Sequence, residues 1–195
     1  NTYDIDWSRV NAFHMDEYIG IDPHAPQSFG EFLRERIFSK HEFKSVNYIN
    51  PLADPEAECK RYGDLLHAFP IDIVFLGIGE NGHLAFNDPC AAFFDDPLTV
   101  KTVDLDPMCI QQQVNDGCFP RVEEVPTHAL TLTVPIMMRV PHMMLVAPTV
   151  LKANAIHNVV LAPVEDEAGH IRYNTVGRLK PGRSYTQGRR SAVYG

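Results

Sequence analysis

The amino-acid sequence predicts an α/β fold built on a doubly wound, mostly parallel sheet. Strand-like apolar runs alternate with helix-like stretches along the chain, and this alternation is typical of a parallel sheet covered by helices on both faces. The run Ile71–Gly77 is almost continuously apolar, which predicts a central strand buried on both faces. A chain of 195 residues fits one domain. Strands are expected at residues 10–15, 45–49, 71–79, 99–105, 128–134 and 142–147.

Three helix-like stretches separate these runs. The first covers residues 28–40 and opens with Ser28 and Glu31, which form an S-x-x-E capping pattern. The second follows Asp54 and Pro55, since proline is favoured in the first helical turn, and its apolar residues recur at a spacing of three to four. The third covers residues 149–161. Ligands of such folds bind at the carboxyl ends of the strands, so the loops at 14–20 and 79–89 are the candidate functional segments.

Composition limits the possible partners. The formal net charge of −8 argues against a general affinity for nucleic acid, and no apolar run approaches the length of about 18 residues that suggests a membrane span. Any phosphate group must therefore be held locally. The tail after His170 carries six Arg or Lys residues and no acid, which favours a solvated tail over a weak polyanion contact. A homo-oligomer remains an open possibility.

The four cysteines show neither a C-x-x-C pair nor a spacing typical of zinc sites, and no signal peptide opens the chain. We therefore expect reduced thiols, a cytoplasmic location and no bound metal. These residues are Cys59, Cys90, Cys109 and Cys118.

The segment 77–82 matches the G-x-G-x-x-G pattern of dinucleotide sites, and Asp104 lies at about the expected distance of 20 residues. A dinucleotide turn opens a helix, however, whereas this one continues into a polar loop closed by Pro89. The glycines instead predict a sharp backbone turn that lets a histidine and a carboxylate face one pocket. No cofactor is expected.

Three side chains in the two loops are candidates for acid-base chemistry. His83 follows the glycine-rich turn, and Asp88 lies close enough in sequence to orient its ring, as a carboxylate does in hydrolytic triads. Asp16 comes just after an apolar strand, where a carboxylate is a candidate general base. Alone, the histidine would more often be a packed or exposed residue, and the acidic pair at 16–17 would be a solvated turn.

Several motifs, taken in order, resemble those of the glucosamine-6-phosphate deaminases, members of the glucosamine/galactosamine-6-phosphate isomerase family. The resemblance covers residues 8–161. M-D-E-Y together with G-H-x-A-F-N distinguishes these deaminases from the related 6-phosphogluconolactonases. The matching segments are M-D-E-Y at 15–18, S-F-G-E-F at 28–32, G-I-G-E-N-G-H-L-A-F-N-D-P at 77–89, V-P-T-H-A-L-T at 125–131 and K-A at 152–153.

The resemblance implies catalytic roles for four residues. Asp16 is the base that moves the C2 proton of the sugar, and His83 opens the pyranose ring. Asp88 supports His83, in a position where the family has the longer Glu. Asn81 stands where the family often has Asp, so His83 would depend on Asp88 for its tautomer and basicity.

The resemblance also implies substrate contacts and a fold of the Rossmann-like, deaminase/6-phosphogluconolactonase type. Lys152 is expected to bind the phosphate, and we expect Glu17, Gly79 and Gly82 at the substrate site. The family's first strand and its Gly-Thr-rich phosphate loop would precede Asn1, so the sheet is expected to lack both. The family's phosphate-binding Arg has no clear counterpart at 109–117. We assign residues 1–163 to the sugar-phosphate isomerase/deaminase-like domain and 164–195 to an atypical basic segment.

The function implied is that of a deaminating aldose-ketose isomerase, a hydrolase/isomerase that converts glucosamine 6-phosphate, or a similar amino-sugar phosphate, to fructose 6-phosphate and ammonia. This chemistry needs no metal. The alternatives are a 6-phosphogluconolactonase-like hydrolase, in which His83 activates water, and a non-catalytic sugar-phosphate sensor domain. A sensor has no need for a C2 base such as Asp16.

Overall fold

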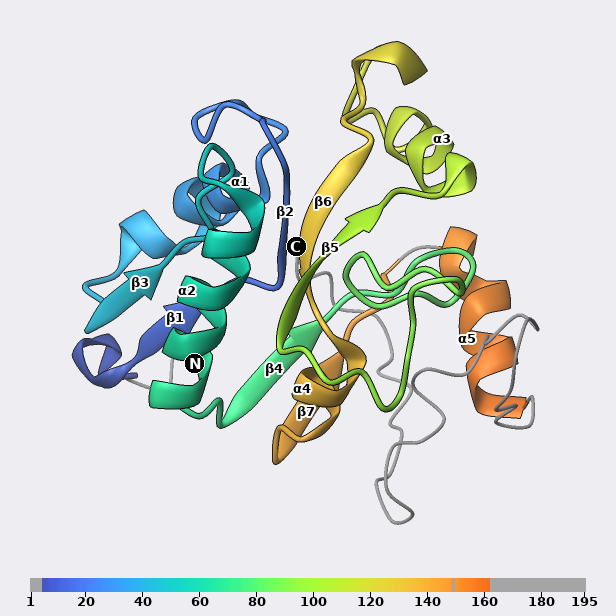
Figure 1. Cartoon of the computed structure of the whole chain (residues 1–195). Helices are drawn as coiled ribbons and strands as arrows, with labels where there is room; N and C mark the ends of the chain where they lie inside the picture. The colour runs from blue at the N-terminus through green and yellow to red at the C-terminus, as the bar shows by residue number, and fades with distance from the viewer. Residues whose placement is uncertain (1–4, 149, 162–195) are drawn as a thin grey trace.

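The computed structural model describes residues 5–148 and 150–161, and its described part has the alternating strands and helices that the sequence predicts (Figure 1). The basic segment assigned to 164–195 lies outside the described residues. The strands are β1 (Asn11–Phe13), β2 (Asp16–Tyr18), β3 (Ser45–Asn47), β4 (Ile73–Leu76), β5 (Val100–Asp104), β6 (His128–Leu132) and β7 (His142–Leu145). The α-helices are α1 (Phe29–Arg36), α2 (Pro55–Ala68), α3 (Pro107–Asn115), α4 (Val134–Met138) and α5 (Ala153–Leu161). Short 3-10 helices cover Trp7–Arg9, Phe38–Lys40, Val122–Glu124 and Val150–Lys152.

The strands form three small sheets. Strand β1 pairs in parallel with β3, and β4 pairs in parallel with β7. The third sheet is antiparallel and has the order β2-β6-β5, which alternation of strands and helices does not predict. Its direction follows from the connection, because the chain leaves β5 through α3 and returns to begin β6 beside the end of β5, with Asp104 opposite His128.

The helices begin where their capping residues predict. The Ser28 hydroxyl accepts a hydrogen bond from the backbone of Glu31 at 3.2 Å, and Asp54 accepts one from Ala57 at 2.9 Å. Each bond satisfies one of the free N–H groups at a helix start. Helix α2 buries Tyr62 on the predicted apolar face. None of the helices within the described residues has the length and apolar character required to cross a membrane.

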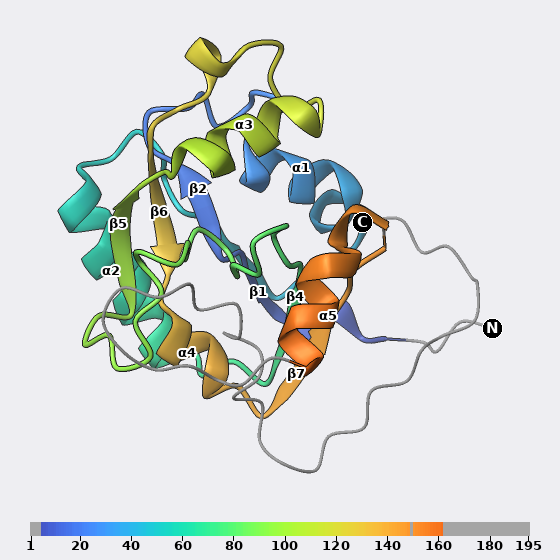
Figure 2. The ribbon, with the colours of Figure 1, turned by 90° about the vertical axis from the view of Figure 1, so that its right-hand side faces the viewer.

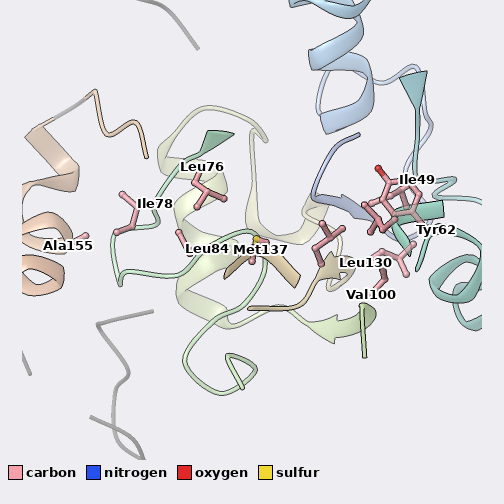
Figure 3. Packing of buried hydrophobic residues seen from close by; sticks show 11 residues of the cluster. Ile49, Tyr62, Leu76, Ile78, Leu84, Val100, Leu130, Met137 and Ala155 are labelled. Carbon is pink, nitrogen blue, oxygen red and sulfur yellow. The ribbon is translucent and has the colours of Figure 1, made fainter. Parts of the chain in front are cut away.

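Two apolar clusters hold the elements together. The larger one joins α2, β4, β6 and α4 to α5, and Figure 3 shows Tyr62 near one end and Ala155 at the other. The smaller one packs Cys109 of α3 with Tyr18 of β2 and Ala129 of β6. Helix α3 therefore crosses above β2 and β6 (Figure 2). Helices α1 and α2 lie on one side of the antiparallel sheet, whereas α5 and residues 77–99 lie on the other (Figure 1).

The prediction that the strand at 71–79 is buried on both faces is wrong for the described part of the chain. Ile73 and Phe75 of β4 are 46% and 60% exposed. Among the described strands, β4 pairs with β7 alone. Alternate side chains of a strand point to opposite faces, so Ile73 and Phe75 lie on the face that the described elements leave open. The apolar run predicted a strand correctly but did not predict what covers it.

Candidate active site

The first candidate loop is a tight turn that joins β1 to β2, and it places Asp16 at the start of β2. Asp16 lies opposite Thr131 of β6 in the antiparallel register. Burial raises the pKa of the Asp16 carboxyl to about 7, and the neighbouring Glu17 carboxylate acts in the same direction. A carboxylate that binds protons near neutral pH has the properties of a general base for a carbon-bound proton.

Glu17 points into the protein, on the opposite face of β2. Its Oε2 accepts hydrogen bonds from the Ser28 hydroxyl at 2.7 Å and from the Gly30 backbone at 3.0 Å. Its Oε1 accepts from the backbone of Tyr18 at 3.0 Å and of Phe29 at 3.2 Å. The carboxylate therefore binds the free N–H groups at the start of α1, where negative charge is also favoured by the helix dipole. Since its side chain is 1% exposed, it fixes β2 against α1.

The second loop brings Asn81, His83 and Asp88 into direct contact. His83 Nδ1 lies 2.6 Å from Asn81 Oδ1 and 3.1 Å from Asp88 Oδ1. Asn81 Nδ2 donates to the same Asp88 oxygen at 3.0 Å. Two acceptors around Nδ1 require it to carry the proton, which leaves Nε2 of a neutral ring as the proton acceptor.

The pKa of Asp88 shows the effect of these contacts. Burial acts to raise the pKa, but the hydrogen bonds from His83 and Asn81, with the charge of His83, outweigh it and hold the pKa below its usual value. The sequence analysis expected Asp88 to be the support of His83. The contact is present, and Asn81 adds a neutral acceptor to it.

The glycines shape this loop around the imidazole. A Cβ added to Gly79 would lie 2.2 to 2.6 Å from three atoms of the His83 ring, so only glycine lets the ring lie against the backbone here. Gly82 has a φ of +86°, a conformation that other residues rarely adopt. The Gly79 backbone N–H also bonds to the carbonyl of His83 at 2.9 Å, which closes the turn.

Thr131 connects the two loops, a role that the sequence reasoning missed. The residue pairs with Asp16 across the β2–β6 ladder. Its hydroxyl accepts hydrogen bonds from the Phe86 backbone at 3.2 Å and from Asn87 Nδ2 at 3.4 Å. Because Phe86 and Asn87 directly precede Asp88, the His83 loop is fixed to the strand that faces Asp16. The signal was present, since Thr131 ends the V-P-T-H-A-L-T segment.

A buried thiol lies beside the second loop. Cys109 of α3 is 2% exposed. Burial raises the pKa of its thiol to about 12, and the charges of Asp88, Asp106 and Asp16 act in the same direction. Ligand atoms of Cys109, His83 and Asp88 lie within 4.8 Å of one another, so α3 packs against the second loop. That Asp16 and His83 meet at one site stays a prediction. Lys152, the expected phosphate ligand, is half-buried just before α5 and makes no ion pair with another described residue.

Known proteins share this arrangement of elements and motifs. The family model of glucosamine-6-phosphate isomerases/6-phosphogluconolactonase matches residues 1–177. The chain belongs to this family. It is 38% identical over 157 residues to a glucosamine-6-phosphate deaminase of Exiguobacterium sp., covering 80% of the chain and 60% of the relative. It is 39% identical over 163 residues to one of Listeria monocytogenes, covering 83% of the chain and 68% of the relative.

Solved structures of the family confirm the fold. A monomeric glucosamine-6-phosphate deaminase superposes with a TM-score of 0.72 at 27% identity, over 86% of this chain and 67% of that one. A 6-phosphogluconolactonase from Thermotoga maritima gives a TM-score of 0.64 at 20% identity, over 81% of this chain and 66% of that one. The second likeness shows the fold alone. The family thus includes a deaminating isomerase and a lactone hydrolase on one scaffold, and the residues at the site must distinguish them.

A separate hollow lies away from these residues. A cavity of about 970 Å³ opens between α2 and residues 93–102. None of the eight expected site residues lines it. The size of a cavity therefore does not locate the candidate site in this molecule.

Proposed function

We propose that the protein is a deaminating aldose-ketose isomerase that converts glucosamine 6-phosphate, or a similar amino-sugar phosphate, to fructose 6-phosphate and ammonia. Two observations carry the proposal. The Asp16 carboxyl has a pKa raised to about 7 and lies opposite Thr131 of β6. The His83 imidazole is held by Asp88 and Asn81. The family offers two chemistries, and only the isomerase needs a base that removes a proton from carbon. The chain spans 60% of the length of the Exiguobacterium deaminase that it matches.

His83 begins the reaction by opening the sugar ring. Its Nε2 takes the proton of the anomeric hydroxyl and delivers it to the ring oxygen, so that the C1–O5 bond breaks and an aldehyde forms. Asn81 and Asp88 hold the Nδ1 proton during both transfers and keep the ring in the required tautomer. A positioned acid-base group of this kind contributes about 10²- to 10⁴-fold.

Asp16 then moves the proton that interconverts the two sugars. The C2 proton of the open aldehyde is acidified by the adjacent carbonyl, and the carboxylate removes it to give an enolamine. Return of the proton to C1 gives an imine at C2, and water hydrolyses the imine to the ketone with release of ammonia. A pKa near 7 lets one carboxyl both accept and return this proton at neutral pH.

Other residues at the site have supporting roles. We assign Glu17 to the structure of the site instead of to substrate contact, because both its oxygens already bind the start of α1. Gly79 and Gly82 shape the loop around the His83 ring. Lys152 is the proposed phosphate ligand, since it is half-buried and makes no ion pair among the described residues.

A lactone hydrolase is the second candidate, because several neighbours with the same fold are named 6-phosphogluconolactonases. In that reaction His83 would activate water for attack on the acyl carbon, and no carbon-bound proton would move. A raised pKa at Asp16 has no use in such a mechanism. Movement of a carbon-bound proton therefore distinguishes the two reactions.

Glucosamine 6-phosphate incubated with the protein in heavy water should give ammonia and fructose 6-phosphate with deuterium at C1. Partial retention of the original proton fits the mechanism, because one carboxyl carries the proton from C2 to C1 before it exchanges. Asp16→Asn should abolish ammonia release and labelling while the protein stays folded, since the amide has the same shape but accepts no proton. Hydrolysis of 6-phosphogluconolactone without any labelling of the amino sugar would refute the isomerase assignment.

A further inference from the structure

We propose that His83, Asp88 and Cys109 together bind one divalent transition-metal ion such as Zn²⁺, and that this ion switches off His83 as a base. One possible ligand atom from each residue lies within 4.8 Å of the other two. The imidazole nitrogen, the carboxylate oxygen and the thiolate are all ligands that zinc accepts. The three residues come from the loop at 79–88 and from α3, so the ion would connect two segments that are far apart in sequence.

The distances suit a metal after a small adjustment. Ligand atoms at about 2.0 to 2.3 Å from a tetrahedral zinc lie roughly 3.3 to 3.8 Å apart. His83 Nδ1 and Asp88 Oδ1 are already 3.1 Å apart. The three ligand atoms lie at most 4.8 Å apart, so the group has to close by about 1 Å at most.

The second observation is an incompletely satisfied carboxylate. Asp88 is 1% exposed, and its Oδ2 is buried without a hydrogen bond of normal geometry, with the Asp106 backbone and the Cys109 thiol as donors close to the carboxylate. Buried polar atoms nearly always have a partner, so such an oxygen marks a place where an ion or a water fits. The Cys109 thiol is also buried, at 2% exposure, and lies beside Asp88. Metal and protein would thus meet in a site already shielded from bulk water.

Binding would block catalysis through the tautomer of His83. In the metal-free loop, Nδ1 carries the proton and donates a hydrogen bond to Asn81 Oδ1 at 2.6 Å. A metal ion on Nδ1 takes its lone pair, so the proton moves to Nε2. Asn81 Oδ1 has to turn away, because it lies 2.6 Å from Nδ1 on the side that the ion would occupy. The thiol of Cys109 loses its proton to solvent, so one proton is released for each ion bound. An imidazole with a proton on Nε2 cannot accept another there.

Cobalt binding tests the site without any assay of activity. In a Cys90→Ser, Cys118→Ser background, which removes the two exposed thiols, one equivalent of Co²⁺ should produce a thiolate-to-cobalt charge-transfer band in the near ultraviolet. Cys109→Ser should remove the band and weaken binding at least ~10-fold, the lower limit of what loss of even an outer partner costs a metal site. Cys59→Ser, which changes a half-buried thiol outside the cluster, is the matched control and should keep both.

The absence of a band in the background protein, or its survival in Cys109→Ser, would overturn the proposal. Circular dichroism of Cys109→Ser establishes that the variant is folded, and Cys109→Ala is the second variant if it is not. His83→Gln should also reduce the affinity for Co²⁺ while keeping the thiolate band weakly at high metal concentration.

Inhibition is the second arm, and it rests on the proposed isomerase activity. Zn²⁺ should abolish ammonia release, and a chelator should restore it. Each variant is compared with its own metal-free rate, and Cys109→Ser should need at least ~10-fold more Zn²⁺ for half-inhibition. Equal sensitivity of Cys109→Ser and Cys59→Ser to Zn²⁺ would refute this site as the cause. If the protein released no ammonia, the cobalt band would still decide the metal site.

Discussion

The turn at 14–17 and the loop at 81–88 each combine a histidine with an aspartate. The pKa of the aspartate is raised in the turn and lowered in the loop. In the turn, burial lowers the pKa of His14 to about 4, against smaller opposing effects of the Asp16 backbone and the Glu58 charge. Burial raises the pKa of Asp16 to about 7 in the same turn. In the loop, the contacts of Asp88 with His83 and Asn81 overcome burial and lower its pKa.

The difference lies in the partners and not in the residue types. Burial and the Glu17 charge both favour the protonated form of Asp16, whereas Asp88 has hydrogen-bond donors at 3.0 and 3.1 Å. His14 Nε2 accepts a bond from the Ile49 backbone at 2.8 Å, which uses its lone pair for structure. One histidine is therefore a structural acceptor, and the other is left with a reactive nitrogen.

The largest expected effect separates the two histidines. His83→Gln should lower kcat by about 10²- to 10⁴-fold, because the proton acceptor for ring opening is lost, with little change in the free energy of unfolding. His14→Gln should do the reverse and reduce the free energy of unfolding by roughly 1–3 kcal/mol, because the Ile49 N–H loses a well-placed acceptor. Ammonia release and chemical denaturation measure the two quantities. A large loss of kcat in folded His14→Gln would show that the turn does more than hold Asp16.

A smaller effect is expected from the support of His83. Asp88→Asn should lower kcat by roughly 10- to 100-fold, since an amide holds the Nδ1 proton less firmly than a carboxylate. Asn81 Oδ1 remains at 2.6 Å from Nδ1, so part of the tautomer preference should survive. Steady-state kinetics with a thermal melt distinguish this from misfolding. Unchanged turnover in Asp88→Asn, with His83→Ala inactive, would show that Asn81 alone is sufficient.

The sequence predicted where helices and strands lie better than it predicted which segments pack against them. The Asp54-Pro55 start gave α2 correctly, and the same Asp-Pro signal at 106–107 precedes α3, which the sequence reading missed. Strand β2 was also missed, because a three-residue strand beside a tight turn has no period to detect. Partners of a strand are set by distant segments, which is why the apolar run at 71–77 did not reveal the exposed face of β4.

The candidate site was predicted where its contacts are local. Asn81, His83 and Asp88 lie within one segment of eight residues. Because this segment forms a compact loop, their side chains are in contact. The links through Thr131 and Cys109 cross between segments and leave no pattern of spacing. The family resemblance placed Glu17 at the substrate, but alternate residues of a strand face opposite sides, and its carboxylate bonds to the start of α1.

The pH dependence of stability distinguishes the two titrating groups of the turn at 14–17, His14 and Asp16. Because His14 has a folded pKa of about 4 and an ordinary value of 6.5, the unfolded chain binds the extra proton between these values, and stability rises with pH. Asp16 does the opposite between its ordinary value of 3.8 and about 7, since the folded chain then binds the extra proton. The two slopes oppose each other in the natural sequence.

In Asp16→Asn, the change of stability with pH that comes from His14 should therefore no longer be offset by Asp16. Between pH 4 and 6.5 its free energy of unfolding should rise more steeply than that of the unaltered protein, by up to about 1 kcal/mol per pH unit. Urea denaturation at several pH values measures both curves, and other titrating groups cancel in their difference. His14→Gln should change the slope in the opposite sense. Parallel curves for Asp16→Asn and the natural sequence would mean that Asp16 is not protonated above its ordinary pKa.

The smallest effect is expected from two helix caps, of which only Ser28 bonds to Glu17 beside Asp16. Ser28 and Asp54 each cap a helix, but the Ser28 hydroxyl also donates to Glu17 at 2.7 Å. Ser28→Ala and Asp54→Ala should each lower the free energy of unfolding by about 1 kcal/mol. Glu17 keeps its three backbone donors in Ser28→Ala, so kcat should fall only about 2- to 5-fold, as β2 and Asp16 lose one anchor to α1. Asp54→Ala should change kcat less, since α2 bonds to the turn at 14–17 through Tyr62, about two helical turns away from this cap. Equal rates in both variants, at equal loss of stability, would show that the backbone bonds of Glu17 alone hold Asp16 in place.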